Sequence, residues 1–229
     1  MNYTPPKIPR KEETKVKKTL CLLIKILADS KIQYRIFGSI LPAALLGRPQ
    51  RKLGDIDLMV DENGKNILFD KLEKEDYTVQ ERRFGLSGFN SPWAVAIKKY
   101  HLEVTIFLGQ FDKEGNFNIF VSRNLKIVAK ASSIKPTPYD LFNLRFIGIP
   151  KTTAFYGALK SKGNPKRKYD LTVFQLKKIE KPPIGYPVID FYYKERRLHF
   201  LYSVFCFLQD FLGRTNVALG RNYDFWKDE

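Results

Sequence analysis

The sequence predicts an α+β fold, in which a mixed sheet flanked by helices is followed by a helical C-terminal region. Within residues 14–134, short apolar stretches with strand-like alternation are interleaved with amphipathic helical patterns. After residue 135, apolar and aromatic residues recur at helical spacing instead. We therefore expect a flexible basic arm at 1–13, a first domain at 14–134 and a helical subdomain at 135–229.

The N-terminal residues divide into an arm and a helix. The opening segment MNYTPPKIPRKE contains three prolines and several charges, and a frayed terminus is favoured over a nucleic-acid contact. Thr14–Ser30 then shows apolar residues near helical spacing, with lysines on the other face. This pattern predicts an amphipathic helix that packs under the first strand.

The central stretch, residues 34–60, predicts two strands that enclose a turn and a short helix. Its elements in order are the strand Tyr34–Phe37, the turn Gly38-Ser39, the apolar helix Leu41–Gly47, the basic loop Arg48–Lys52 and the strand Gly54–Val60. The rest of the chain is organised around this stretch, because it contains the residues with the clearest chemistry.

The second of these strands carries two carboxylates. Asp55 and Asp57 point to the same face, because alternate residues of a strand do, and they lie about 7 Å apart along it. Carboxylate oxygens at that spacing can converge on hard cations. Gly38 permits a tight turn that leaves the next N–H groups and the Ser39 hydroxyl free at a helix start, which attracts phosphate. The stretch therefore predicts a phosphate cradle beside an acidic metal site, the two parts needed to move a phosphoryl or nucleotidyl group.

A third carboxylate lies on a later strand. The elements expected after residue 60 are the helix Asn63–Lys74, the strand Tyr77–Arg82, the loop Phe84–Pro92, a hairpin of Trp93–Ile97 and Leu102–Leu108, and the extended stretch Asn118–Ala129. Glu103 interrupts the apolar strand of that hairpin, and buried carboxylates are rare unless they are paired or bound to metal. The alternative is that Glu103 lies on the exposed face of an antiparallel strand.

Helical patterns dominate the C-terminal part. They cover Tyr139–Ile147, Thr152–Lys160 and the aromatic stretch 188–212. For the aromatic stretch, a core helix is favoured over a nucleobase-stacking platform, because its large apolar residues have helical neighbours. Cys21 and Cys206 lie in apolar helical patterns and are expected to be buried hydrophobic side chains.

Composition narrows the class of partner. Hydrophobic residues make up 44% of the 229 positions, and 40 basic against 24 acidic residues give a net charge of +16. Such an excess favours polyanions such as RNA, DNA or nucleotides, although it also fits a surface adapted for solubility. The sequence shows no signal peptide and no apolar run long enough to cross a membrane, so we expect a cytoplasmic location.

The Gly38-Ser39 turn followed by Asp55-Ile56-Asp57 on an apolar strand resembles the DNA polymerase β-like nucleotidyltransferase superfamily, and in particular its minimal and AbiEii-type (toxin-like) members. The resemblance implies a nucleotidyltransferase fold, with the nucleotide phosphates at the turn and magnesium at the two aspartates. It also implies a third carboxylate on a later strand, for which Glu103 is the candidate. Fifteen residues separate Ser39 from Asp55, which is more than the family usually has, and RPQRK has the position of an insertion.

Two further segments extend the resemblance. The segment KRKYDL is similar to the Lys-Asp-x-x-Asp motif of AbiEii-type proteins, with Lys166 and Asp170 in matching positions and Arg167 in place of the first aspartate. The resemblance implies that Asp170 orients Lys166 or interacts near the nucleotide. The segment YDLFNLRF is similar to the preceding helix, where Arg145 takes the place of a nucleotide-contacting lysine and can grip phosphate bidentately. The alternative is a solvated basic loop before a helix.

The implied reaction is transfer of a nucleoside monophosphate from an NTP such as ATP to an acceptor hydroxyl, with loss of pyrophosphate. Two Mg²⁺ ions, or Mn²⁺ in their place, would be held by Asp55, Asp57 and Glu103, and Glu103 is also the candidate for taking the hydroxyl proton. The basic charge favours RNA, such as a tRNA end, over an aminoglycoside, and a protein hydroxyl comes third. The toxin-like members suggest a toxin–antitoxin or defence pair with a cognate protein partner.

The rival class is a non-catalytic nucleic-acid- or protein-binding module that keeps the same fold. Loss of one carboxylate would mark such a module, whereas all three candidates are present here. A P-loop phosphotransferase is excluded because the chain has no G-x-x-x-x-G-K-[ST] motif. A serine hydrolase is disfavoured because G-x-S-x-G is absent as well.

Overall fold

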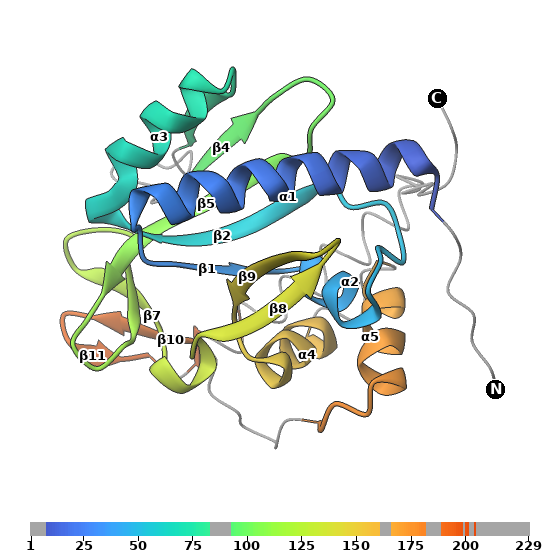
Figure 1. The fold of residues 1–229 in the computed structure, drawn as a ribbon. Coiled ribbons are helices and arrows are strands. Elements are labelled where there is room, and N and C mark those ends of the chain that lie inside the picture. The colour runs from blue at the N-terminus through green and yellow to red at the C-terminus, as the bar shows by residue number, and fades with distance from the viewer. Residues whose placement is uncertain are drawn as a thin grey trace, which may run out of the picture.

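The computed structural model describes residues 8–82, 93–160, 166–181, 189–198, 200, 201 and 204. Its centre is a curled mixed sheet with helices packed against it, so the predicted α+β class is confirmed (Figure 1). The strands in chain order are β1 (Tyr34–Phe37), β2 (Asp55–Asp61), β3 (Thr78–Arg82), β4 (Trp93–Ile97), β5 (Glu103–Phe111), β6 (Phe117–Phe120), β7 (Leu125–Ala129), β8 (Thr137–Leu141), β9 (Leu144–Gly148), β10 (Ile189–Tyr193) and β11 (Arg196–Arg197).

These eleven described strands form one branched sheet. Their order is β11-β10-β7-β6-β5-β2-β1-β9-β8, and β4 adds a branch by pairing with both β5 and β3. The branch arises because β5 is long: its residues 104–107 pair with β4, whereas Gln110 and Phe111 pair with β6. The sheet is mixed, since β2 runs parallel to β5 and antiparallel to β1.

The helices lie on different sides of the sheet. They are α1 (Arg10–Ser30), α2 (Ile40–Leu46), α3 (Lys65–Lys74), α4 (Lys151–Lys160) and α5 (Lys166–Leu176), with the short 3₁₀ turns η1 (Glu62–Gly64) and η2 (Ala131–Ser133). In Figure 1, α1 crosses the central strands in the upper part of the view, whereas α2, α4 and α5 lie together at the lower right. No helix in the described ranges is both long and apolar enough to cross a membrane.

The central strands have two unlike faces. Alternate residues of β1, β2 and β5 are completely or almost completely removed from solvent, namely Ile36, Ile56, Leu58, Val60, Val104 and Ile106. They share a core with the buried residues of α1, and burial of each such side chain contributes roughly 1.5–3 kcal/mol. Because successive side chains of a strand alternate in direction, the opposite face carries Asp55, Asp57 and Glu103. One apolar face therefore orients the three carboxylates.

The predicted helix Tyr139–Ile147 is wrong, because this segment forms the antiparallel hairpin of β8 and β9. Its turn residues Phe142 and Asn143 both have positive φ, at 56° and 63°, as a tight two-residue hairpin turn requires. Tyr139 and Leu141 on one strand and Phe146 on the other are buried with exposed residues between them. This alternation with a period of two decides the structure, and the leucine spacing that mimics a helical register does not.

The expectation of an all-helical region after residue 135 is also wrong for the described residues. Four strands, β8 to β11, lie there together with α4 and α5, and β9 pairs in parallel with β1 of the central sheet. Residues 189–193 of the predicted aromatic helix form β10, whereas most of the segment beyond 198 lies outside the described residues. The sheet therefore continues past the predicted boundary at 134.

Other differences are small. Helix α1 begins at Arg10, inside the predicted arm, and Cys21 on this helix is exposed rather than buried. Cys206 and the predicted loop at 84–92 lie outside the described residues. The predicted extended stretch Asn118–Ala129 is two antiparallel strands, β6 and β7, joined by a turn. The other predicted elements within the described residues agree with the structure to within a few residues at their ends.

Candidate active site

Two parallel strands bring the three candidate carboxylates to one edge of the sheet. In the register of β2 and β5, Asp55 lies beside Glu103 and Asp57 lies beside Thr105. Both strands begin at these positions, so all three carboxylates lie where β2 and β5 start. This register puts Glu103 on the same face as Asp55 and Asp57.

The Gly38-Ser39 turn meets the carboxylates at the same edge. Strand β1 ends at Phe37, which lies opposite Asp57, and Gly38 follows with a φ of 77°. A Cβ built at Gly38 would lie 2.0 Å from Oδ2 of Asp57, which is far inside van der Waals contact. Glycine is therefore required twice, once by the backbone conformation and once by the carboxylate.

Of the two aspartates, Asp57 is the one whose surroundings raise its pKa. Burial, and after it the neighbouring charge of Asp55, raise its pKa from 3.8 to about 8, although Arg167 and Arg51 act in the opposite direction. Like charges close together and poor solvation both favour the protonated acid. A divalent cation between the two carboxylates would reverse both effects, because it favours their charged forms.

Arg51 completes the site from the basic loop, and the sequence did not single it out. Its guanidinium lies against Asp170 of α5, with Nε donating to Oδ1 and Nη2 donating to Oδ2, both at 3.1 Å. The two side chains are only 3% and 1% exposed. Nη2 of Arg51 also donates to Oγ of Ser39 in the phosphate turn. The loop that was expected to be an insertion therefore reaches into the site.

Asp170 is fully buried and gathers the surrounding donors. Besides Arg51, it accepts hydrogen bonds from Nε2 of Gln50 at 2.8 Å and from Nη1 of Arg167 at 3.1 Å. Asp170 thus holds Arg51 rather than acting on a ligand directly. The side chain of Lys166, which the resemblance paired with Asp170, lies outside the described residues.

Arg145 does not lie with the other predicted residues. It is exposed on β9, opposite Asp140 of β8. Gly148 of the same strand lies beside Ile36, so Arg145, three residues earlier, lies toward the start of β1, away from the turn at its end. The prediction that Arg145 belongs to a helix beside the nucleotide is therefore not supported by its position.

The carboxylates suit a hard divalent cation by their chemistry. Asp55, Asp57 and Glu103 offer only oxygen ligands, which Mg²⁺ and Mn²⁺ prefer. Among the residues that the structure describes, no group of three His, Cys, Asp or Glu side chains is closely enough gathered to enclose a metal ion. The three carboxylates thus have the right ligand atoms for such a metal and lie on one face of the sheet, but their side chains are not gathered around a single point in this structure.

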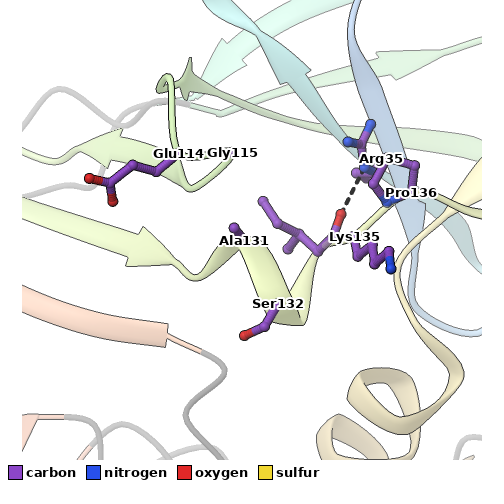
Figure 2. A pocket seen from close by; sticks show the side chains of 8 residues that line it. Arg35, Glu114, Gly115, Ala131, Ser132, Lys135 and Pro136 are labelled. Atoms are coloured by element: carbon purple, nitrogen blue, oxygen red, sulfur yellow. Dashed lines mark hydrogen bonds between the residues drawn. The ribbon is translucent and has the colours of Figure 1, made fainter.

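A separate hollow lies elsewhere on the described surface. Figure 2 shows this cavity of about 360 Å³, which is lined by Arg35, Glu114, Gly115, Ala131, Ser132, Ile134, Lys135 and Pro136. Nε of Arg35 donates to the carbonyl oxygen of Ile134 at 2.8 Å, and the guanidinium lies over the Phe111 ring. None of the carboxylates or turn residues lines this cavity, so it is separate from the edge of the sheet that carries them.

Comparisons with known proteins agree with this geometry. Residues 19–89, which contain the turn, the basic loop and both aspartates, match the family described as aminoglycoside-2''-adenylyltransferase. Lincosamide antibiotic adenylyltransferase LnuA, solved with lincomycin, is 15% identical at a TM-score of 0.57, over 70% of this chain and 96% of that one. No curated protein sequence matches the chain.

Two structures of the antibiotic-resistance factor ANT(2'')-Ia also match. The solution structure is 12% identical, has a TM-score of 0.51 and covers 90% of this chain and 97% of that one. The complex with adenylyl-2''-tobramycin is 11% identical, has a TM-score of 0.52 and covers 87% and 97%. The fold is thus the nucleotidyltransferase fold.

The contact between Gly38 and Asp57 yields a testable expectation. Gly38→Ala should lower transfer activity strongly, because its Cβ displaces the Asp57 carboxylate. Gly47→Ala is the matched control, since Gly47 has a φ of 80° and no atom within 4 Å of the added Cβ. Both changes carry the same backbone strain, of about 1–2 kcal/mol. Thermal unfolding should thus shift similarly for both, and a similar loss of activity in both would argue against the contact.

The raised pKa of Asp57 predicts a dependence of stability on pH. Its folded-state pKa lies near 8, above the ordinary 3.8, so the unfolded state loses this proton first. In metal-free buffer the wild type should lose stability relative to Asp57→Asn as pH rises from about 4 to about 8, with no further divergence above. Melting temperatures measured in chelator across this range test the expectation.

Asp70→Asn provides the control for that series, because Asp70 is exposed on α3. Its melting temperature should follow the wild type at every pH. Addition of Mg²⁺ at pH 8 should raise the melting temperature of the wild type and of Asp70→Asn more than that of Asp57→Asn. A constant offset between wild type and Asp57→Asn across the whole range would contradict the assignment.

Proposed function

We propose that the protein transfers an adenylyl group from ATP to a hydroxyl of a small molecule of the aminoglycoside or lincosamide class. The observation that carries this proposal is the pair Asp55 and Asp57 packed against the Gly38-Ser39 turn, in a chain that covers nearly the whole length of LnuA and ANT(2'')-Ia. LnuA is named as an adenylyltransferase and its structure contains lincomycin, and the structure of ANT(2'')-Ia contains adenylyl-2''-tobramycin. The family description of residues 19–89 points the same way.

The chain's own residues supply the parts of this reaction. Asp55, Asp57 and Glu103 would hold divalent cations, which when bound neutralise charge on the triphosphate and lower the pKa of the attacking hydroxyl. Glu103, beside Asp55, is the candidate for accepting the hydroxyl proton. The turn and the guanidinium groups of Arg51 and Arg167, which lie near enough to Asp57 to lower its pKa, would stabilise the negative charge that builds on the phosphates as pyrophosphate leaves.

RNA remains a second candidate acceptor because of one specific observation, the net charge of +16. A positive surface attracts a polyanion and repels an aminoglycoside, which carries several amines. A lincosamide avoids much of this conflict, because repulsion grows with the charge of the ligand. The charge therefore favours a lincosamide-like acceptor within the proposed class. AbiEii-type membership, with a toxin or antitoxin as partner, stays a prediction.

Label transfer would identify the acceptor. The protein is incubated with Mg²⁺ and each α-labelled NTP in turn, with tobramycin, lincomycin, total tRNA or a protein extract offered separately. We expect label from ATP on an antibiotic, and Asp57→Asn should lower the rate more than about 100-fold, because metal binding contributes several kcal/mol to such transition states. The exposed change Asp70→Asn should leave the rate unchanged.

The outcomes separate the candidates. Label on tRNA alone, with steeply weaker transfer at higher salt, would replace the small-molecule proposal by an RNA acceptor. Label on protein would indicate the third candidate. Full activity in Asp57→Asn would contradict the metal assignment whatever the acceptor.

A further inference from the structure

The environment of Arg51 differs from that of an ordinary buried ion pair. A guanidinium has five N–H donors. Two of them bind Asp170, one from Nη1 binds the carbonyl oxygen of Lys52 at 3.1 Å, and one from Nη2 binds Oγ of Ser39. A buried ion pair gives little net stability against hydrophobic side chains of similar size. The contact with Ser39 supplies a functional reason for burying the pair.

This contact fixes the direction of the Ser39 hydroxyl. A serine hydroxyl has one donor and two acceptor positions, and its proton otherwise rotates freely. Because Oγ accepts from Arg51, the proton of Ser39 must point away from the guanidinium. Gly38, the other half of the turn, touches Asp57, and Arg51 is near enough to Asp57 to lower its pKa. The Ser39 hydroxyl, the Arg51 guanidinium and the Asp57 carboxylate therefore lie close together at the end of β1.

We propose that Arg51 is a positioning residue for Ser39, which it holds so that the hydroxyl proton donates to an oxygen of the β- or γ-phosphate of the bound triphosphate. Asp170 in turn positions Arg51, because its two carboxylate oxygens fix the plane of the guanidinium. The inference rests on the proposed nucleotidyl transfer, since it requires a triphosphate at the turn. It assigns α5, far away in sequence, a part in nucleotide binding.

The competing explanation is that Arg51 and Asp170 only fasten the basic loop to α5. In that case any loss on mutation comes from a displaced loop, and it would not depend on Ser39. A route through Ser39 instead predicts that the two side chains are energetically coupled, because removing either one removes the same hydrogen bond to phosphate.

A double-mutant cycle distinguishes the two explanations. Dissociation constants for Mg·ATP, pyrophosphate and AMP are measured for wild type, Ser39→Ala, Arg51→Lys and the double variant, with no acceptor present. Each single change should weaken Mg·ATP and pyrophosphate about tenfold, the value of one hydrogen bond to a charged group. The double variant should be little weaker than either single variant, and AMP binding should change less than about twofold.

Lys52→Gln is the matched control, because Lys52 is the exposed neighbour of Arg51 in the same loop. It removes one positive charge and should leave all three dissociation constants within about twofold of the wild type. A similar loss for Lys52→Gln and Arg51→Lys would mean that long-range charge, rather than the contact with Ser39, accounts for the effect.

Other outcomes overturn the proposal directly. A double variant about a hundredfold weaker than wild type would show independent contributions, and equal losses for AMP and Mg·ATP would show a structural tie. If Arg51→Lys does not fold, as judged by near-UV circular dichroism, Asp170→Asn takes its place in the cycle with the same expectations. A wild type that binds Mg·ATP but labels neither antibiotic overturns the acceptor assignment and leaves this inference intact.

Discussion

The contact between Gly38 and Asp57 is the constraint on which the site depends. It exists because β1 and β2 pair with Phe37 opposite Asp57, so the turn that ends one strand meets a carboxylate on the next. A shift of one residue in this pairing would move both aspartates to the apolar face. The buried residues Ile36, Ile56 and Leu58 prevent that shift, and the hydrophobic core thereby sets the geometry of the catalytic edge.

Charge is balanced around this contact by residues from distant elements. Asp55 and Asp57 repel one another, and Arg51 and Arg167 partly offset the repulsion. The two guanidinium groups also share Asp170, which holds both of them near the carboxylates.

Local pattern was sufficient to predict the first half of the site and insufficient for the second. The strand, glycine turn and alternating aspartates are contiguous, so residues 34–60 specify their own geometry, and β1 was predicted with its observed ends. Glu103 was chosen through the family resemblance, and its parallel register with Asp55 became visible only in the structure. Arg51 and Asp170 are 119 residues apart, and no local sequence pattern indicates that they pair. The hairpin of β8 and β9 was predicted as a helix because its leucines also fit a helical spacing. Arg145 was misplaced for the same reason.

The long span between Arg51 and Asp170 has a consequence for how the molecule is made. During synthesis, the strands that hold Asp55, Asp57 and Glu103 leave the ribosome well before residue 170 does. Until α5 appears, the guanidinium of Arg51 lacks the carboxylate that allows its burial, and an unpaired buried charge is strongly unfavourable. The edge that carries the carboxylates can therefore form early. Arg51, which contacts the Gly38-Ser39 turn, gains Asp170 only when nearly three quarters of the chain has emerged. Completion of the turn is thus among the later steps of folding.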